Sequence, residues 1–489
     1  MLLPDLDREG PLYSQIYRSI RSAVLRKTLL PKYRLPSTRD LAIELGVSRN
    51  TIMQAYDQLL AEGYLEARLG AGTFVAPKIP DEGVIVRTAL QRQVRAPSPD
   101  LQEHLSEYAK RVAGPATGGL RPLDSRLRID FRYGVPNLED FPADEWRVIA
   151  AQRMRRPAKE SLIYADPAGY RPLRDAIVRY VREHRGIICS ADDVTVVNGS
   201  QQALDIVARA LIDPADRVLM ENPCYPGARV AFQALGAKID HIDVDTEGLD
   251  VDRVLRLQHR VKLAYVTPSH QFPTGGVMML ARRLKFLQWA HDSQTFVLED
   301  DYDSEYRYGG RPIEAIQSLD TYGRVVYFGT FSKILAPSLR LGYIISPSAL
   351  TPTLQRIKSI TDRHASLPGQ QVLADFIASG EFERHMRRSR TRNDARRQAL
   401  LKALSQAFGD HVSVQGANAG LHVLLWFKDR PASQIDEIVE RAAGRGIGVY
   451  SIAPFYVGPL PRAGLLLGYS SLDEVEIIVG VNALARALL

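Results

Sequence analysis

The first eighty residues place apolar and polar positions in the order expected for short helices followed by a hairpin. After Ser48 the apolar residues recur every three or four positions, as on one face of a helix, at Ile52, Ala55, Tyr56, Leu59 and Leu60. A shorter helix opens at Ser37, a residue type that caps helix N-termini, and Gly46 supplies the turn between the two helices. Segment 64–75 predicts two strands around a tip of small residues.

Short β-branched runs separated by helical stretches fill the chain from residue 129 onward. The five clearest runs span 194–198, 217–220, 262–267, 295–300 and 324–330. Strands of this kind predict an α/β fold whose mostly parallel sheet is covered by helices on both faces. After about residue 350 the pattern turns helical and basic, and it ends in strand-like segments at 419–427 and 446–452. This change predicts a small C-terminal α+β lobe.

The region between these two patterns is rich in Pro, Gly, Ala and Arg and has little apolar period. Such a composition is typical of a linker. We therefore predict a first domain at 8–76, a linker at 77–128 and a second domain at 129–489. The basic residues of the linker are interpreted as solvated, with contact to an anionic partner as the alternative.

The overall composition is that of a folded globular protein, because 45% of the 489 residues are hydrophobic and 24% are charged. The two cysteines, Cys189 and Cys224, form neither a disulfide framework nor a zinc motif, so we predict no structural metal and a reducing cytosolic environment. No apolar run approaches the roughly 20 residues that span a bilayer, and the opening MLLPDLDREG does not resemble a signal peptide. We expect a cytoplasmic protein with no membrane partner.

The net charge of +7 is concentrated near the start of the chain. Within residues 11–50 only Asp40 and Glu44 oppose a set of basic side chains: Arg18, Arg21, Arg26, Lys27, Lys32, Arg34, Arg39 and Arg49. On the helix that follows Ser48, polar positions near the start face away from the apolar stripe, where a recognition helix presents side chains to base edges. This predicts a winged helix-turn-helix that binds double-stranded DNA. The alternative is a capped helical hairpin in a protein contact domain.

Three segments then strengthen the DNA-binding interpretation: PLYSQIYRSIRSAVL, LPSTRDLAIELGVSRNTIMQAYDQLLAEGYL and GAGTFV. Over residues 11–75 they closely resemble the DNA-binding domain of GntR-type bacterial regulators, which implies binding to operator DNA. The resemblance implies direct DNA contacts by Arg39, Arg49 and the wing Gly72, and positions near phosphate for Ser37, Ser48 and Thr51. Thr28 and Lys32 stand where the family often has glycines, and we expect this departure to change a loop and not the readout.

The candidate chemistry of the second domain rests on residues at the ends of predicted strands. Lys333 follows a strand and precedes Arg340; lysine condenses with aldehydes, and arginine binds a phosphate ester in a bidentate fork. Gly199 leads from a strand into a helix whose N-terminus can bind an anion. Asp300 ends a strand, where a carboxylate can hold a pyridine nitrogen protonated. Each segment alone also fits an exposed loop or an ordinary helix start, but together they describe a site for pyridoxal 5′-phosphate.

Residues 129–489 resemble a fold-type I aminotransferase, and the fusion with the first domain resembles MocR regulators, bacterial transcription factors with an aminotransferase-like domain. The resemblance implies that Lys333 forms a Schiff base with pyridoxal 5′-phosphate, that Asp300 pairs with the ring nitrogen and that Tyr302 bonds the ring hydroxyl. It implies that Tyr225 stacks on the ring, with a core tyrosine as the alternative. It also implies that Tyr164 reaches the phosphate of a neighbouring subunit, hence a homodimer. The phosphate is expected among Gly199, Ser200, Gln201, Thr330, Ser332 and Arg340.

Two departures from aminotransferases bear on function. Where those enzymes usually carry Asn-Pro-Thr-Gly this chain has SHQFPTGG, so Phe272 replaces an asparagine and His270 and Gln271 are the candidates to substitute for it in part. Enzymes of this fold place an arginine for the substrate carboxylate just before the last strand. Here GLLLGYS offers only leucines, with Arg462 as the candidate stand-in. Because weaker binding of the substrate carboxylate impairs the substrate orientation that turnover needs, we expect the second domain to be a sensor and not an efficient catalyst.

We therefore predict a bacterial transcription regulator that binds operator DNA as a dimer and carries pyridoxal 5′-phosphate in its larger domain. An amino compound that exchanges at Lys333 is expected to shift the arrangement of the DNA-binding domains. Three alternatives stay open: an active aminotransferase with an accessory DNA-binding domain, a regulator whose effector is pyridoxal phosphate itself, and a degenerate domain kept for dimerisation. The presence of Lys333, Asp300 and Arg340 disfavours the last alternative.

Overall fold

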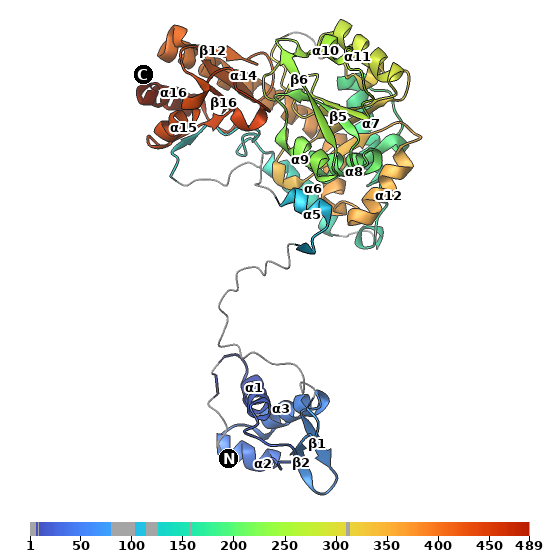
Figure 1. Ribbon diagram of the computed structural model, residues 1–489, viewed down its shortest axis with the longest axis vertical. Helices are drawn as coiled ribbons and strands as arrows, with labels where there is room; N and C mark the ends of the chain where they lie inside the picture. Colours follow the sequence, from blue (N-terminus) through green and yellow to red (C-terminus); the bar gives the residue numbers. More distant parts are fainter. Residues whose placement is uncertain are drawn as a thin grey trace. The chain divides into compact units, whose positions relative to one another are not determined.

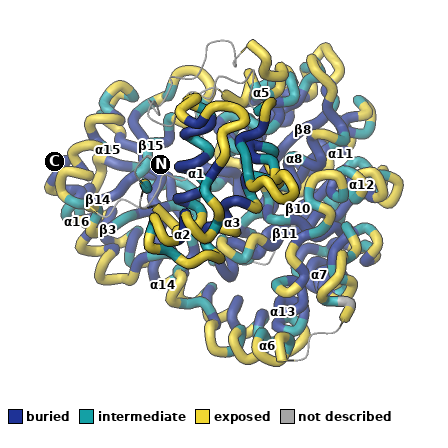
Figure 2. Tube along the Cα trace, turned by 90° about the horizontal axis from the view of Figure 1, so that it is seen from below, coloured by how far each residue is buried: buried dark blue, intermediate teal, exposed yellow. Residues whose placement is uncertain are grey.

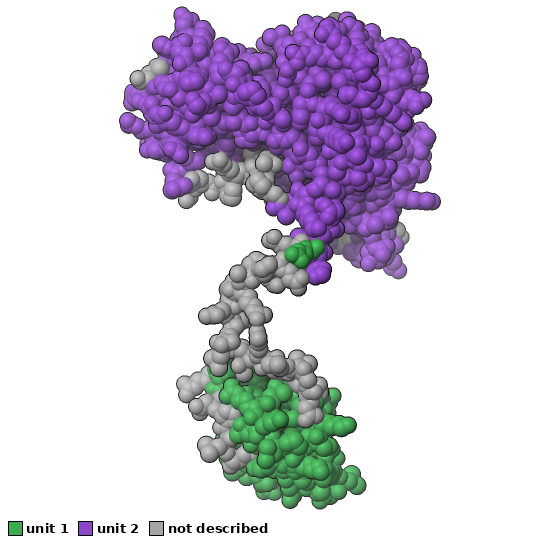
Figure 3. All heavy atoms as spheres, viewed as in Figure 1, with its two compact units in different colours: residues 1–103 green, residues 104–489 purple. Residues whose placement is uncertain are grey.

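A computed structural model of the chain describes residues 6, 7, 9–79, 103–113, 126–155, 159–309 and 313–488. The chain divides into two compact units, Met1–Glu103 and His104–Leu489 (Figure 3). Each unit encloses hydrophobic cores of its own, so each is a fold by itself.

The first unit packs helices against a two-stranded hairpin (Figure 1). Its elements are α1 (Leu12–Leu25), α2 (Thr38–Leu45), α3 (Arg49–Ala61), β1 (Leu65–Arg68) and β2 (Gly72–Val75). The apolar faces of the helices meet in one core, where Ile20, Leu41, Ile52 and Leu59 are fully buried. Each such side chain contributes about 1.5–3 kcal/mol relative to exposure. The predicted helix pair and hairpin are confirmed.

Local caps fix the two helices that form the helix-turn-helix. The Ser37 hydroxyl oxygen accepts a hydrogen bond from the Asp40 backbone N–H at 3.2 Å, and Gly46 ends α2 in the left-handed conformation. The Ser48 hydroxyl accepts from the Thr51 N–H, also at 3.2 Å, and so starts α3. The Tyr56 hydroxyl donates to the Pro36 carbonyl at 3.0 Å, which ties α3 to the loop before α2.

An eight-stranded sheet forms the centre of the second unit, in the order β4-β11-β10-β9-β8-β5-β6-β7. Its strands are β4 (Val194–Val197), β5 (Arg217–Asn222), β6 (Lys238–Asp245), β7 (Gly248–Leu249), β8 (Leu263–Val266), β9 (Phe296–Asp301), β10 (Val325–Thr330) and β11 (Gly342–Ile345). The strands from β10 to β6 pair in parallel, whereas β11 lies antiparallel between β4 and β10. The mostly parallel sheet and its five predicted strands are confirmed.

Helices cover both faces of this sheet. One face packs against α8 (Ser200–Leu211), α9 (Pro226–Ala234) and α12 (Thr351–Asp362). The other packs against α7 (Arg171–Arg185), α10 (Val251–Val254), α11 (Leu280–Asp292) and α13 (Leu367–Ala378), with α6 (Ala143–Arg155) beside α13. Because successive strand residues point to opposite faces, Leu298 joins one core and Val297 the other. Figure 2 shows β10 and β11 as buried and the outer turns of α12 as exposed.

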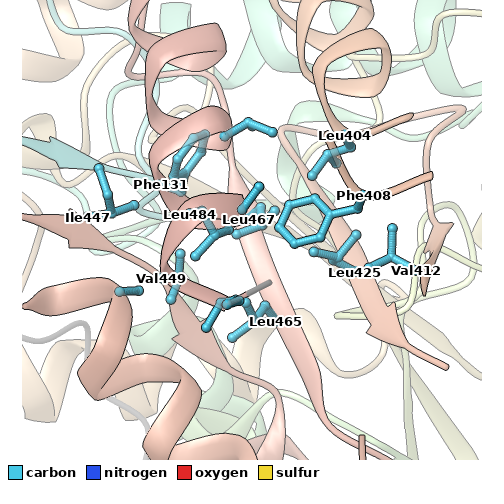
Figure 4. Packing of buried hydrophobic residues seen from close by; sticks show 14 of the residues in the cluster. Phe131, Leu404, Phe408, Val412, Leu425, Ile447, Val449, Leu465, Leu467 and Leu484 are labelled. Carbon is cyan, nitrogen blue, oxygen red and sulfur yellow. The ribbon is translucent and has the colours of Figure 1, made fainter. Parts of the chain in front are cut away.

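The small lobe is an antiparallel sheet covered by helices. Its strands β12 (Val412–Gln415), β13 (His422–Phe427), β16 (Gly464–Gly468) and β15 (Tyr450–Ser451) lie in that order, while β14 (Ile447–Gly448) pairs with β3 (Ile129–Asp130). The helices are α14 (Glu381–Phe408), α15 (Ile435–Ala443) and α16 (Glu474–Leu488). Phe408, Leu425 and Leu467 pack with Leu484 of α16 in the lobe core (Figure 4). The predicted α+β lobe is thus present, with β3 joining it from the start of the unit.

One helix, α5 (Glu107–Val112), lies within the range 77–128 that the composition assigned to a linker. The Ser106 hydroxyl caps it by accepting from the Ala109 N–H at 3.1 Å. Arg111 Nε donates to the Ala234 carbonyl at the end of α9 at 3.0 Å, so this part of the range packs on the second unit. Residues 80–102 and 114–125 of the predicted linker lie outside the described residues. Within the described ranges, none of the helices is both long and apolar enough to cross a membrane.

Candidate functional site

A cavity of about 210 Å³ opens where the parallel strands of the large sheet end. The carboxyl ends of parallel strands are where sheets of this type bind ligands. The loops after β4, β5, β8, β9 and β10 line the cavity, and the small lobe closes it with Leu421, His422 and Phe455. Five residues that the sequence assigned to the cofactor lie on its wall: Ser200, Tyr225, Asp300, Tyr302 and Lys333.

Lys333 projects into this cavity from the loop that follows β10. Its Nζ donates a hydrogen bond to the Gly134 carbonyl at 2.6 Å, although the two residues lie 199 positions apart in the sequence. Burial lowers the pKa of the Lys333 ammonium below its ordinary value, although Asp303 and Asp300 act in the opposite direction. A lysine with a lowered pKa is more often neutral, and the neutral amine is the form that attacks a carbonyl.

Asp300, near the end of β9, is a buried carboxyl group with one free oxygen. Its Oδ2 accepts a hydrogen bond from the Tyr265 hydroxyl at 2.6 Å. Its Oδ1 is buried and has no hydrogen-bond partner among the described residues. Burial raises the pKa of Asp300 to about 7, against the opposing effects of the Tyr265 hydrogen bond and the Lys333 charge. A cationic N–H donor at Oδ1 would satisfy this oxygen and stabilise the carboxylate.

Backbone and side-chain donors form an anion-binding cup next to Ser200, a residue of the cavity wall. Gly199 leads into α8 at φ +84°, and Arg340 Nη2 donates to the neighbouring Asn198 carbonyl at 2.7 Å. A Cβ at Gly199 would lie 3.1 Å from Arg340 Nη2, so the glycine lets the guanidinium lie against the helix start. The first N–H groups of a helix and an arginine fork are the groups that bind phosphate. Beside them, the Ser332 N–H donates to the Thr330 hydroxyl at 3.1 Å.

Aromatic rings make up the opposite wall. Phe272 lies edge-to-face with Tyr225, Tyr302 and Phe455, at centroid distances of 6.0, 5.5 and 5.3 Å. Tyr133, from the loop after β3, packs on the same ring at 6.2 Å. Such a cluster is apolar and rigid, so it shapes the cavity for a flat or apolar body.

Three buried polar side chains, His270, Asp303 and His422, form a cluster next to Tyr302. His270 Nδ1 lies 2.8 Å from the Tyr302 hydroxyl and 3.1 Å from both carboxylate oxygens of Asp303. Burial raises the pKa of Asp303, and the adjacent imidazole opposes this rise. His422 packs on His270 and lies 3.2 Å through Nε2 from the Pro273 carbonyl; burial lowers its pKa to about 3, so it is neutral. The cluster holds the Tyr302 hydroxyl in one place.

The candidate DNA-binding residues lie on the first unit around the start of α3. Arg39 and Arg49 are exposed, and Arg49 Nε lies 3.4 Å from the Thr38 hydroxyl. The hydroxyls of Ser48 and Thr51 lie 2.8 Å apart, at the N-terminus of α3. In the hairpin Gly72 pairs with Arg68, and a Cβ at Gly72 would lie 3.1 Å from Arg34 Nε. Exposed arginines beside a helix N-terminus are typical of a surface that binds phosphate and base edges.

Comparisons with known proteins agree with both units. The family described as "Bacterial regulatory proteins, gntR family" matches residues 12–75, and "Aminotransferase class I and II" matches residues 133–459. The "Probable rhizopine catabolism regulatory protein MocR" of Rhizobium meliloti is 38% identical over 492 residues, covering 100% of this chain and 96% of the relative. The "HTH-type pyridoxine biosynthesis transcriptional regulator PdxR" of Corynebacterium glutamicum is 30% identical, covering 94% of this chain and 92% of the relative.

This chain belongs to the MocR-type regulators. Their two parts, a GntR-type DNA-binding domain and an aminotransferase-like domain, are both present. Among solved structures, the α-aminoadipate aminotransferase LysN of Thermus thermophilus matches with a TM-score of 0.72 and 29% identity, covering 79% of this chain and 98% of that chain. That match carries the fold-type I assignment of the second unit.

The class I and II aminotransferase family is pyridoxal-phosphate-dependent, and the cavity of this chain fits that group. The partnerless Oδ1 of Asp300 suits a protonated ring nitrogen, and the cup at Gly199 and Arg340 suits a phosphate. Lys333 lies on the same cavity wall as Asp300 and Ser200, the residue that follows Gly199. The amine, the carboxylate and the phosphate-binding cup therefore suit the aldehyde, the ring nitrogen and the phosphate of the cofactor.

Three other residues that the sequence singled out, Gln201, Tyr164 and Arg462, do not line the cavity. Gln201 is exposed, and its Nε2 lies 3.3 Å from the Gly227 carbonyl at the edge of the cup. Tyr164 is 79% exposed and packs on Arg363 and His364, away from the cavity lining, so its contact with a neighbouring subunit stays a prediction. Arg462 lies over the Trp426 ring, 5.5 Å from its centroid, and is not part of the cavity wall.

The suggestion that Gln271 replaces the missing asparagine is wrong. Its side-chain amide donates to the Pro223 and Phe272 carbonyls at 2.8 and 2.7 Å, and it is fully buried behind the cavity. His270 does reach the site, through Tyr302.

Several residues of the site were not found from the sequence, among them Gly134, His422, Tyr265 and Asp303. Gly134 and His422 are far from the motifs in sequence and carry no pattern of their own. Tyr265 ends a buried strand, and its position one strand away from Asp300 was the available signal. Asp303 lies in the acidic run after β9, where the choice between a solvated loop and a buried partner needed the fold.

Proposed function

We propose that this protein is a transcription regulator that binds operator DNA as a homodimer through the first unit and holds pyridoxal 5′-phosphate at Lys333 in the second. The observation that carries the cofactor assignment is that Lys333 and the partnerless Asp300 oxygen belong to one 210 Å³ cavity, with the Gly199–Arg340 cup next to Ser200 of its wall. Full-length similarity to regulators of the same two-part organisation supports the DNA-binding role.

Each residue has a defined task in this proposal. Lys333 supplies the amine that condenses with the cofactor aldehyde, and its lowered pKa favours the reactive neutral form. Asp300 accepts the ring N–H and so keeps the ring protonated, while Tyr265 fixes the orientation of the carboxylate. Bound pyridoxal phosphate supplies an electrophilic carbon for amines and a ring that withdraws electrons. Tyr302, held by His270 and Asp303, presents a hydroxyl to the ring oxygen.

On the DNA side, we propose that α3 enters the major groove with Arg49 near its start and that the hairpin contacts the backbone. Arg39 and Arg49 are free to move toward DNA because they are exposed. Ser37 and Ser48 hold the helix starts that face phosphate, since each hydroxyl already caps its helix.

The regulatory step is proposed to be exchange of an amino compound at Lys333, which changes contacts between the aromatic wall and the small lobe. Coupling requires that the effector binds two arrangements of the protein with different affinity. A second candidate effector is pyridoxal phosphate itself, which the name of the 30% identical relative favours. Operator affinity of cofactor-free and cofactor-loaded protein, both without added amine, separates the two: a difference larger than about tenfold, or ~1.4 kcal/mol, supports the cofactor as effector.

Absorption spectroscopy tests the cofactor site. Wild-type protein supplied with pyridoxal phosphate should show a visible band that Lys333→Ala abolishes. Lys285→Ala is the matched control, because Lys285 is an exposed lysine paired with Asp252 and should leave the band intact. A band that survives in Lys333→Ala, or disappears equally in both variants, would refute the assignment. Steady transamination at the rate of a metabolic enzyme would instead favour the aminotransferase alternative.

A further inference from the structure

The cavity wall carries little positive charge once the cofactor is accounted for. Its charged side chains are Lys333, Asp300 and Asp303. Asp300 and, at the neighbouring cup, Arg340 are engaged by the cofactor in the proposed function. Exchange releases Lys333 as an amine whose pKa is lowered by burial, and Asp303 is a buried carboxylate held by His270. His422, the remaining ionisable group from the small lobe, is neutral because burial lowers its pKa to about 3. The part of the wall left to an effector therefore offers a carboxylate and apolar rings.

Apolar side chains fill β16, the last strand of the small lobe, where the sequence has leucines and no arginine. Leu466, in the middle of β16, is fully buried between Leu424 of β13 and Tyr450 of β15. It packs in one cluster with Phe272 and Phe455, two of the rings that line the cavity. An apolar side chain thus stands directly behind the aromatic wall.

The arginines of neighbouring segments are engaged elsewhere. Arg462 lies over the Trp426 ring at 5.5 Å, and Arg132 Nε pairs with Asp130 at 3.1 Å. Arg229 Nη2 donates to the Pro454 carbonyl at 2.9 Å. None of the three is among the described residues that line the cavity.

We infer that the cavity selects amines that carry no carboxylate on the amino-bearing carbon and whose body is apolar or aromatic. This inference rests on the proposed function, because the amine is recognised beside the cofactor held by Lys333. A carboxylate at that carbon would be buried beside Asp303 without a cationic partner, which is costly in a water-poor cavity. An aromatic or aliphatic body instead packs on Phe272 and Phe455.

Matched ligand pairs test this selection in the full-length, cofactor-loaded protein. Phenethylamine and phenylalanine, and likewise tyramine and tyrosine, differ only in the carboxylate. The shift of the visible cofactor band gives the half-saturating concentration of each. We expect each amine to act at a concentration at least about tenfold lower than its amino acid, which corresponds to ~1.4 kcal/mol.

Two variants sharpen the test. Leu466→Arg places a cation behind the aromatic wall, so the amino acid of each pair should then have the lower half-saturating concentration. Leu466→Met keeps the apolar contact, so the amine of each pair should keep the lower half-saturating concentration, as in the wild type. If Leu466→Arg does not fold, as judged by its tryptophan fluorescence, the wild-type pairs decide alone. Equal or lower half-saturation by the amino acids, or no shift with any of the four compounds, would overturn the inference. Absence of the cofactor band in wild-type protein would instead overturn the proposed function.

Discussion

Asp300 gives a prediction with opposite signs for stability and for cofactor binding. In the cofactor-free protein its carboxylate is buried with Oδ1 unpartnered, so replacement by the neutral asparagine should stabilise the second unit. Its pKa rises from 3.8 to about 7 on folding. Because the pKa of Asp300 is higher in the folded than in the unfolded protein, its protonation stabilises the fold. This stabilisation is complete below about pH 4 and is lost as the pH rises through about 7.

The magnitude follows from that rise in pKa. At ~1.4 kcal/mol per pKa unit, Asp300 costs the folded state roughly 4 kcal/mol at pH 8, where it is ionised, and roughly 2 kcal/mol at pH 5, where folding must protonate it. We expect Asp300→Asn to raise the free energy of unfolding of cofactor-free protein by up to these amounts. The same change removes the acceptor for the ring N–H, so cofactor affinity should fall about 10- to 100-fold.

Urea unfolding followed by tryptophan fluorescence measures this directly. The three tryptophans, Trp146, Trp289 and Trp426, all lie in the second unit, so the signal reports that unit alone. Asp301→Asn is the matched control, because Asp301 pairs with the buried Arg185 at 2.6 Å. Removing the Asp301 carboxylate should lower the free energy of unfolding by about 3–5 kcal/mol at both pH 8 and pH 5. A loss of stability in Asp300→Asn at pH 8, or a gain that does not shrink at pH 5, would refute the account of Asp300.

Three further predictions concern both units. Arg49→Ala should weaken binding to a DNA site selected in vitro with wild-type protein by about 10- to 100-fold in a gel-shift titration, and unchanged affinity would remove α3 from the interface. Gly199→Ala should weaken cofactor binding at least about tenfold in a spectroscopic titration, because its Cβ would meet Arg340 Nη2 at 3.1 Å and φ is +84°; unaltered affinity would contradict the cup. Lys32→Gly should slow amide hydrogen exchange in α1–α3 about fivefold, since Lys32 has φ +67° and glycine removes strain of ~1 kcal/mol; faster exchange would contradict this.

Much of the fold follows from patterns that are local in the chain. The helix after Ser48, the cap at Ser37 and the five main strands were predicted within a few residues of their observed bounds, because a residue's face and cap depend on its near neighbours. β11 was not predicted, since its four apolar residues gain strand structure from pairing between β4 and β10. Likewise α5 is a helix where composition predicted a linker, and Arg111 anchors it to α9.

The sequence by itself determined the chemistry available: an amine at Lys333 and a carboxylate at Asp300, each near the end of a strand that its own residues specify, and a guanidinium at Arg340. Only the tertiary structure decided which groups these three meet. Packing of the small lobe brought His422 and Phe455 to the cavity, turned Arg462 onto Trp426 and placed Gly134 at Lys333. These contacts join residues far apart in sequence, and their energies come from burial and pairing that exist only once the sheet and the lobe have closed around the cavity.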